Sequence, residues 1–125
     1  MNKDWDESKP IFLQVKEQIE DAVMDDSLKA GDRAPSTNEF ASVYQINPAT
    51  AGKGINELVA EGILLKRRGV GMFVTDEAKE IVIEKRKQTF FEHYMLPLKR
   101  EARKLRMNEQ ELIDMLRREG DLDED

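Results

Sequence analysis

Apolar positions near the start of the chain recur at helical spacing. After Pro10, which suits the first turn of a helix, apolar side chains three and four residues apart predict an amphipathic helix over residues 10–26. Residues 27–33 then contain the mixture of polar residues and glycine that is typical of a turn, with Gly31 as the expected residue of positive φ. The chain therefore opens with one helix and a sharp turn.

Two further helix starts follow in quick succession. Ser36 and Glu39 have the spacing of a capping box, which predicts a short second helix ending near Gln45. Asn47 followed by proline is the N-cap pattern of a third helix, which we expect to run to about Glu61. The link between these two helices is short, as in a helix-turn-helix.

A predicted β-hairpin comes next. Two short apolar segments, residues 63–67 and 72–75, flank the glycine-rich basic turn Arg68–Gly71. Three helices followed by such a hairpin predict a winged helix-turn-helix, in which the third helix enters the major groove of DNA and the hairpin is the wing.

The outward face of the third helix carries little bulk. Gly52 and Gly54 lie inside the helix, where each glycine costs about 1 kcal/mol relative to alanine. Either close approach of the backbone to a partner surface or close packing against the second helix would compensate. Lys53 has no apolar neighbour to cover in this pattern, and we expect it to project towards DNA.

The remainder of the chain is strongly charged and predicted to be helical. A helix over residues 77–106 should kink or break at Pro97, and Asn108 should cap a short last helix that ends at Gly120, before an acidic, disordered tail over residues 121–125. An apolar stripe on these helices is too large for such a short segment to bury alone, which predicts a homodimer. The expected interface comprises Phe90, Phe91, Tyr94, Met95, Leu98, Leu105, Leu112 and Leu116.

The predicted fold is thus mostly α, in two parts. Residues 1–75 form a winged helix-turn-helix DNA-binding domain, and residues 76–125 form a short all-α dimerisation segment with the acidic tail.

Composition excludes several functions. The chain has no cysteine and a single histidine, which removes disulfides and thiolate metal sites and argues against a zinc or histidine-based enzyme. No apolar run approaches the ~20 residues of a membrane span, and the first residues lack the apolar core of a signal peptide. We expect a cytoplasmic protein that is not an enzyme and needs no metal or cofactor.

The net charge of −6 conceals a basic region. Residues 28–75 carry six basic against four acidic residues, a net charge of +2, and residues 62–75 carry three cations and no acid. Exposed charges act over roughly 8–10 Å at cellular salt, so an acidic protein with one basic face can still bind DNA.

Several motifs together resemble one family. The chain contains PIFLQ, the segment LKAGDRAPS, LVAEGIL in the third helix and RRGVGMFV in the wing. Residues 10–74 are similar to the N-terminal winged helix of the GntR family of bacterial transcription regulators. The NPAT start of the third helix and the short, proline-interrupted helical tail resemble its YtrA subfamily, which implies that the C-terminal part serves dimerisation. We expect a dimeric regulator, a repressor rather than an activator, although the sequence does not fix the sign of regulation. A two-fold dimer would bind a palindromic operator in double-stranded DNA.

The resemblance also implies which residues contact DNA. It places residues of the second helix start on the DNA backbone, residues of the third helix in the groove, and the wing on DNA. Three positions depart from the family, because Asn38, Pro48 and Gly52 stand where many members have arginine. The implied contacts are Ser36, Thr37, Asn38, Asn47, Ala49, Thr50, Lys53, Arg67, Arg68 and Gly69.

Some questions stay open from the sequence. Asn47 is a helix cap as well as a potential DNA contact, and a winged helix could also serve as a protein-interaction adaptor without DNA. An effector would have to bind near Phe90 to Leu98, and neither its existence nor its identity can be read from the sequence. By analogy with the subfamily, the target would be a transporter operon.

Overall fold

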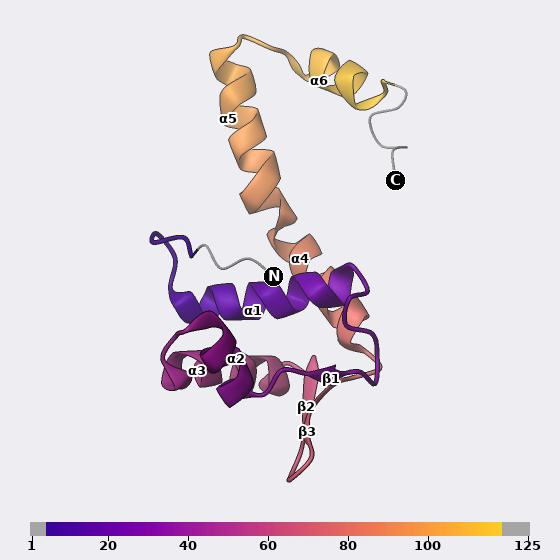
Figure 1. Ribbon diagram of the computed structural model, residues 1–125. Coiled ribbons are helices and arrows are strands. Elements are labelled where there is room, and N and C mark those ends of the chain that lie inside the picture. The colour runs from indigo at the N-terminus through magenta and orange to yellow at the C-terminus, as the bar shows by residue number, and fades with distance from the viewer. Residues whose placement is uncertain (1–4, 119–125) are drawn as a thin grey trace. The chain divides into compact units, whose positions relative to one another are not determined.

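A computed structural model describes residues 5–118 (Figure 1). The element order confirms the mostly α prediction, with helices and a small sheet. The elements are α1 (Ile11–Met24), β1 (Arg33–Ala34), α2 (Thr37–Tyr44), α3 (Pro48–Ala60), β2 (Leu64–Arg67), β3 (Gly71–Val74), α4 (Ala78–Phe90), the π-helix η1 (Phe91–Met95), α5 (Leu96–Lys104) and α6 (Glu109–Leu116).

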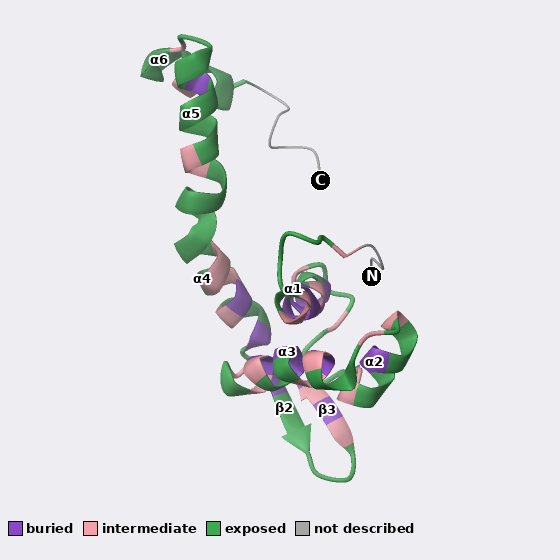
Figure 2. Cartoon of the chain, turned by 90° about the vertical axis from the view of Figure 1, so that its left-hand side faces the viewer, coloured by how far each residue is buried: buried purple, intermediate pink, exposed green. Residues whose placement is uncertain are grey.

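The chain divides into two compact units, with the boundary after Arg86. In the first unit, α1 and α2 both pack on α3, and the buried sides of these helices form one core with the sheet (Figure 2). The largest fully buried side chains in it are Phe40, Ile19, Ile55, Leu58, Ile63, Leu64, Val15, Val23 and Val82.

The predicted hairpin is part of a three-stranded antiparallel sheet. β2 and β3 pair with Leu64 opposite Val74 and Arg67 opposite Gly71. The two-residue strand β1 adds to the other edge of β3, where Arg33 lies opposite Phe73, so the strand order is β1-β3-β2. The segment predicted only as a turn therefore also anchors the base of the wing.

The boundary between the two compact units, after Arg86, lies further along the chain than the predicted domain boundary after residue 75. Ala78 and Val82 of α4 are buried in the core of the first unit, so the start of α4 packs with the winged helix. The assignment of DNA binding to the first part and dimerisation to the second remains a prediction.

Gly54 in α3 has a packing role that the sequence did not reveal. A Cβ at Gly54 would lie 2.7 Å from the backbone oxygen of Phe12 and 3.0 Å from Cγ1 of Val15. The close approach at this glycine is therefore to α1, and neither to α2 nor to an external partner. Gly52 lies on another face, where an added Cβ would meet Thr37 Cγ2 at 3.4 Å.

In the second unit, the break predicted at Pro97 takes the form of the π-helical segment η1, which immediately precedes α5. Proline cannot donate a backbone hydrogen bond to the preceding turn, and π-helical turns are a common way to accommodate such a break. Asn108 caps α6 in a capping box with Glu111, as predicted. The predicted helix end at Gly120 and the tail 121–125 lie outside the described residues.

None of the helices within residues 5–118 has the length and apolar character needed to cross a membrane.

Candidate nucleic-acid interface

The start of α2 and the wing enclose a shallow hollow of about 350 Å³. The turn of the wing bends through Gly69 and Gly71, whose φ angles of +77° and +140° suit glycine and few other residues. This wing hollow is lined by Ser36, Thr37, Asn38, Lys66, Arg67, Gly69, Val70, Gly71 and Met72.

A second hollow of about 600 Å³ lies at the start of α3. Asn47, Ala49 and Lys53 are exposed on it, and Thr50 is half-buried. This helix hollow is lined by Ile11, Phe12, Ile46, Asn47, Ala49, Thr50 and Lys53.

The wing hollow reaches α3 through the start of α2. Thr37, which lines the wing hollow, lies against Gly52, the residue next to Lys53 in α3. The structure therefore groups the residues predicted at the start of α2 with Arg67 and Gly69 of the wing, and it groups the residues predicted on α3 in a hollow of their own. Arg68 lies in the exposed turn of the wing and lines neither hollow. Figure 2 shows this turn fully exposed at the end of β2 and β3.

Four basic side chains on this surface form no salt bridge with a described acid. Within residues 5–118, no salt bridge involves Lys53, Lys66, Arg67 or Arg68. The guanidinium of Arg67 lies 5.1 Å from the centroid of the Phe73 ring, which holds its stem against the sheet. Four cations are therefore available to the phosphates of a nucleic acid.

Side-chain caps accept from backbone N–H groups at both helix starts on this surface. The Ser36 hydroxyl accepts a hydrogen bond of 3.1 Å from the Glu39 N–H, and the Glu39 carboxylate accepts one of 2.9 Å from the Ser36 N–H. This backbone hydrogen bond and the nearby Arg33 lower the pKa of Glu39. At α3, Asn47 Oδ1 accepts from the Ala49 N–H at 2.8 Å. Asn47 is thus a cap that uses its side-chain oxygen and leaves its side-chain NH₂ group out of this bond.

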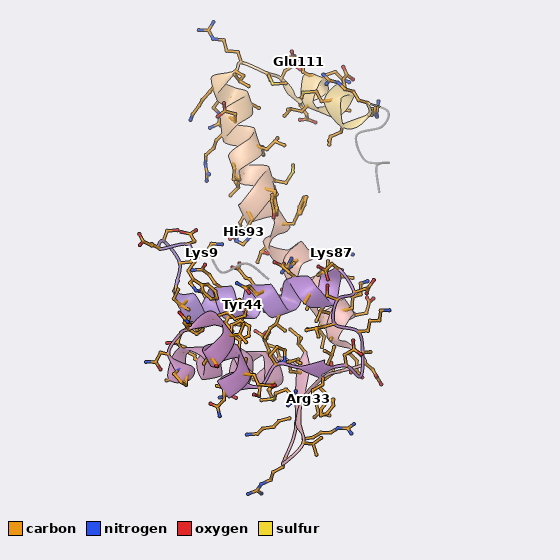
Figure 3. The ribbon with its side chains drawn as sticks, in the orientation of Figure 1. Lys9, Arg33, Tyr44, Lys87, His93 and Glu111 are labelled. Atoms are coloured by element: carbon orange, nitrogen blue, oxygen red, sulfur yellow. The ribbon has the colours of Figure 1, made fainter. Side chains whose placement is uncertain are left out.

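Two residues of this surface were missed by sequence reasoning. The Lys53 ammonium lies 3.9 Å from the centroid of the Phe12 ring, so the expectation that Lys53 has no apolar neighbour is wrong. Arg33 lies beside the wing at Gly71 (Figure 3) and forms a salt bridge of 3.3 Å with Glu39. A basic residue at the end of a turn gives a weak signal for Arg33, and no local signal connects Phe12 to Lys53.

The predicted dimer stripe lies on the end of α4, η1, α5 and α6. Most of its side chains are exposed in the chain as described, including Tyr94 at 65% and Leu116 at 67%, while Met95 and Leu112 are half-buried. Phe90 and Tyr94 pack together with ring centroids 5.4 Å apart. Exposed apolar surface of this kind is typical of protein interfaces.

No group of three or more acidic or histidine side chains within residues 5–118 is placed to hold a metal ion. His93 is exposed.

Comparison with known families decides the class of this winged helix. The profile of the bacterial regulatory proteins of the gntR family matches residues 12–74, half of the chain. The chain belongs to the gntR family. The matched segment begins at Phe12 on the helix hollow and ends at Val74 in the last strand of the sheet, so it contains all of the predicted DNA contacts.

Three known proteins illustrate the likeness of this gntR-family chain. It is 35% identical over 77 residues to the HTH-type transcriptional repressor YtrA of Bacillus subtilis, a match that covers 62% of this chain and 59% of YtrA. A GntR family transcriptional regulator from Listeria monocytogenes is 26% identical, with a TM-score of 0.74 over 90% of this chain and 96% of that one. The BusR protein of S. agalactiae, solved in complex with its busAB-promotor DNA, is 25% identical, with a TM-score of 0.58 over 84% of this chain and 50% of BusR.

These comparisons confirm the predicted winged helix-turn-helix and the resemblance to the YtrA group. The relatives are transcriptional regulators rather than enzymes.

Proposed function

We propose that this gntR-family chain is a dimeric, sequence-specific DNA-binding repressor. The observation that carries the proposal is the grouping of the predicted contacts in the helix hollow and the wing hollow of a winged helix, with four cations on them that no described acid neutralises. The repressor assignment is supported by the relative named as a repressor, which shares the matched region. We further propose that the protein acts in the cytoplasm. By analogy with the YtrA group, we propose that the operon it regulates encodes a transporter.

In this proposal, each part of the surface has a separate role. The exposed residues at the start of α3, above all Lys53, read base edges in the major groove, which is wide enough for one helix. Ser36, Thr37 and Asn38 at the start of α2 bind the DNA backbone, and so does the wing, through Arg67, Arg68 and Gly69.

The proposal assigns the exposed apolar stripe of the second unit to a homodimer. A two-fold dimer presents two α3 helices to a palindromic site and doubles the number of phosphate contacts. Nothing in the described residues identifies an effector, and the proposal does not need one.

Selection of bound duplexes from a random DNA pool tests this function. We expect enrichment of a palindromic sequence whose half-sites are about one helical turn, or a multiple of it, apart. As a control, Lys29→Ala removes an exposed cation outside both hollows and should select the same sequence. If no sequence is enriched over repeated rounds, the DNA-binding proposal fails, and the winged helix would instead be an adaptor for another protein.

A further inference from the structure

We infer that Phe12 of α1 is a positioning residue for the reading of DNA by Lys53. The inference rests on the proposed function and extends it to a helix that is not part of the helix-turn-helix itself. Phe12 and Lys53 both line the helix hollow, and the Lys53 ammonium lies 3.9 Å from the centroid of the Phe12 ring.

The backbone contact between α1 and α3 fixes this pair in place. The carbonyl oxygen of Phe12 lies 2.7 Å from the position that a Cβ on Gly54 would take, directly after Lys53 in the chain. Only a glycine lets the two helices approach so closely here, and Val15 is buried beside the same contact. The backbone of Phe12 is therefore held against α3, and its ring lies by the Lys53 ammonium, while the Lys53 side chain remains exposed.

The ring supplies the contact that orders the ammonium. Within residues 5–118, Lys53 forms no salt bridge, so no carboxylate competes with the aromatic face. An ammonium has three N–H donors, and a ring engages one side of it, so donors remain for an acceptor on DNA.

Ordering of the Lys53 side chain by Phe12 affects which acceptor on DNA it binds. A free lysine side chain has large rotamer entropy, part of which must be lost whenever it binds one atom. A lysine side chain held over Phe12 has already lost much of this rotamer entropy. Its N–H donors are therefore confined to one position before DNA binds. That favours a defined base acceptor, such as the O6 and N7 atoms of guanine, over any phosphate within reach.

A double-mutant cycle on the full chain tests the inference. The variants are Phe12→Leu, Lys53→Met and the double variant, measured by fluorescence anisotropy on two duplexes of equal length, one selected by the wild type from a random pool and one of mixed sequence. Phe12→Leu should lower the selected-to-mixed affinity ratio by about two- to fivefold, the size expected of one exposed cation–π contact. The same change should have no further effect in the Lys53→Met background.

Three controls separate positioning from folding. Phe12→Tyr keeps an aromatic face and should retain the wild-type ratio. Leu13→Ala alters an exposed neighbour on α1 that lines neither hollow, and it should also retain that ratio. Urea unfolding of each variant should show that any fall in the ratio occurs in folded protein. In NMR spectra without DNA, the ring should shift the Lys53 ε-methylene protons upfield in the wild type but not in Phe12→Leu.

The outcomes distinguish the inference from the function on which it rests. Independent, multiplicative effects of Phe12→Leu and Lys53→Met on the ratio, or loss of the ratio in Phe12→Tyr, overturn the positioning role while leaving DNA binding intact. A wild-type protein that does not discriminate between the two duplexes overturns the proposed function and the positioning role together.

Discussion

Two glycines only two positions apart in α3 have different surroundings. Gly54 faces α1, where the Phe12 carbonyl oxygen leaves no room for a side chain, whereas Gly52 faces Thr37 across an ordinary van der Waals distance. Both glycines weaken the helix intrinsically, but only Gly54 is required by packing. The pair therefore separates the effect of close helix packing from the effect of helix propensity.

We expect opposite effects of alanine at these two positions. Gly54→Ala should destabilise the fold by about 1–3 kcal/mol, because its methyl group would collide with the backbone of α1. Gly52→Ala should stabilise it by up to about 1 kcal/mol through helix propensity. Urea denaturation measures both, and a Gly54→Ala variant as stable as the wild type would contradict the close contact with α1.

The capping box at the start of α2 is a second test at the residue scale. Ser36→Ala removes the hydroxyl that accepts from the Glu39 N–H, and it should lower the free energy of unfolding by about 1 kcal/mol. Ser42→Ala, an exposed serine within the same helix, is the matched control and should cost nothing. Equal urea midpoints for the two variants would show that the cap does not stabilise the helix.

Single residues also show the limits of sequence reasoning. The Ser36 cap, the Asn47 cap and the positive φ of Gly31 were predictable, because each depends on residues that are neighbours in the chain. The Phe12–Lys53 contact was not, because it joins residues far apart in the chain that only the packing of α1 on α3 brings together.

At the scale of elements, buried and half-buried charges connect α1, α3 and α4. The ammonium of Lys16 on α1, almost fully buried, donates to Glu57 at 2.9 Å and to Glu61 at 3.0 Å at the end of α3. Lys85 on α4 bridges Glu61 and Glu20. This charged cluster, defined as Lys16, Glu20, Glu57, Glu61 and Lys85, holds the start of α4 against the winged helix.

The pKa shifts in the charged cluster have opposite signs. Burial lowers the pKa of Lys16, but its hydrogen bonds to Glu57 and Glu61 outweigh burial and raise the pKa above 10.5. Burial raises the pKa of Glu61, but hydrogen bonds from Lys85 and Lys16 outweigh it and lower the pKa below 4.5. The stabilisation from Lys16 is therefore present below pH 10.5 and lost as the pH rises through its raised pKa. That from Glu61 is present above pH 4.5 and lost as the pH falls through its lowered pKa.

This cluster predicts a pH-dependent effect of Glu61→Gln. At neutral pH the variant should lose about 1–2 kcal/mol of stability, because two charged hydrogen bonds are weakened. Well below pH 4.5 the wild-type carboxyl is itself protonated, so the two proteins should converge. Urea denaturation across this pH range checks the prediction, with exposed Glu84→Gln as a control of small effect. A difference that does not shrink in acid would mean that the charge of Glu61 is not the cause.

The sheet and the second unit show which elements could be predicted. The strands of the wing were predictable from apolar segments around a glycine-rich turn. β1 was not, because two residues are too few to show a period, and its pairing with β3 depends on the fold. The break near Pro97 was predictable from the missing N–H, but its π-helical form was not.

At the scale of the whole molecule, the proposed function depends on a dimer. The exposed apolar stripe of the second unit is its proposed interface, and two copies would bury what one leaves in solvent. Association also doubles the number of cations that meet DNA, which increases affinity and its dependence on salt.

Acidic substitutions in the stripe should therefore dissociate the protein. Tyr94→Asp with Leu98→Asp should shift the mass in analytical ultracentrifugation from dimer to monomer, because both side chains are exposed in the single chain and two charges would be buried on association. Val43→Asp places a charge on an exposed apolar position of α2 and should leave the dimer intact. A doubly substituted protein that remains dimeric would place the interface elsewhere.

The central claim is that the start of α3 and the wing together form one DNA-binding surface. The most direct test is the salt dependence of affinity for the selected operator, compared between the wild type and Arg67→Ala with Arg68→Ala. If both arginines bind phosphates, the double variant should bind every sequence more weakly, and the slope of log affinity against log salt should become shallower by about two per protomer, or about four for the dimer. An unchanged affinity and slope would contradict the assigned surface.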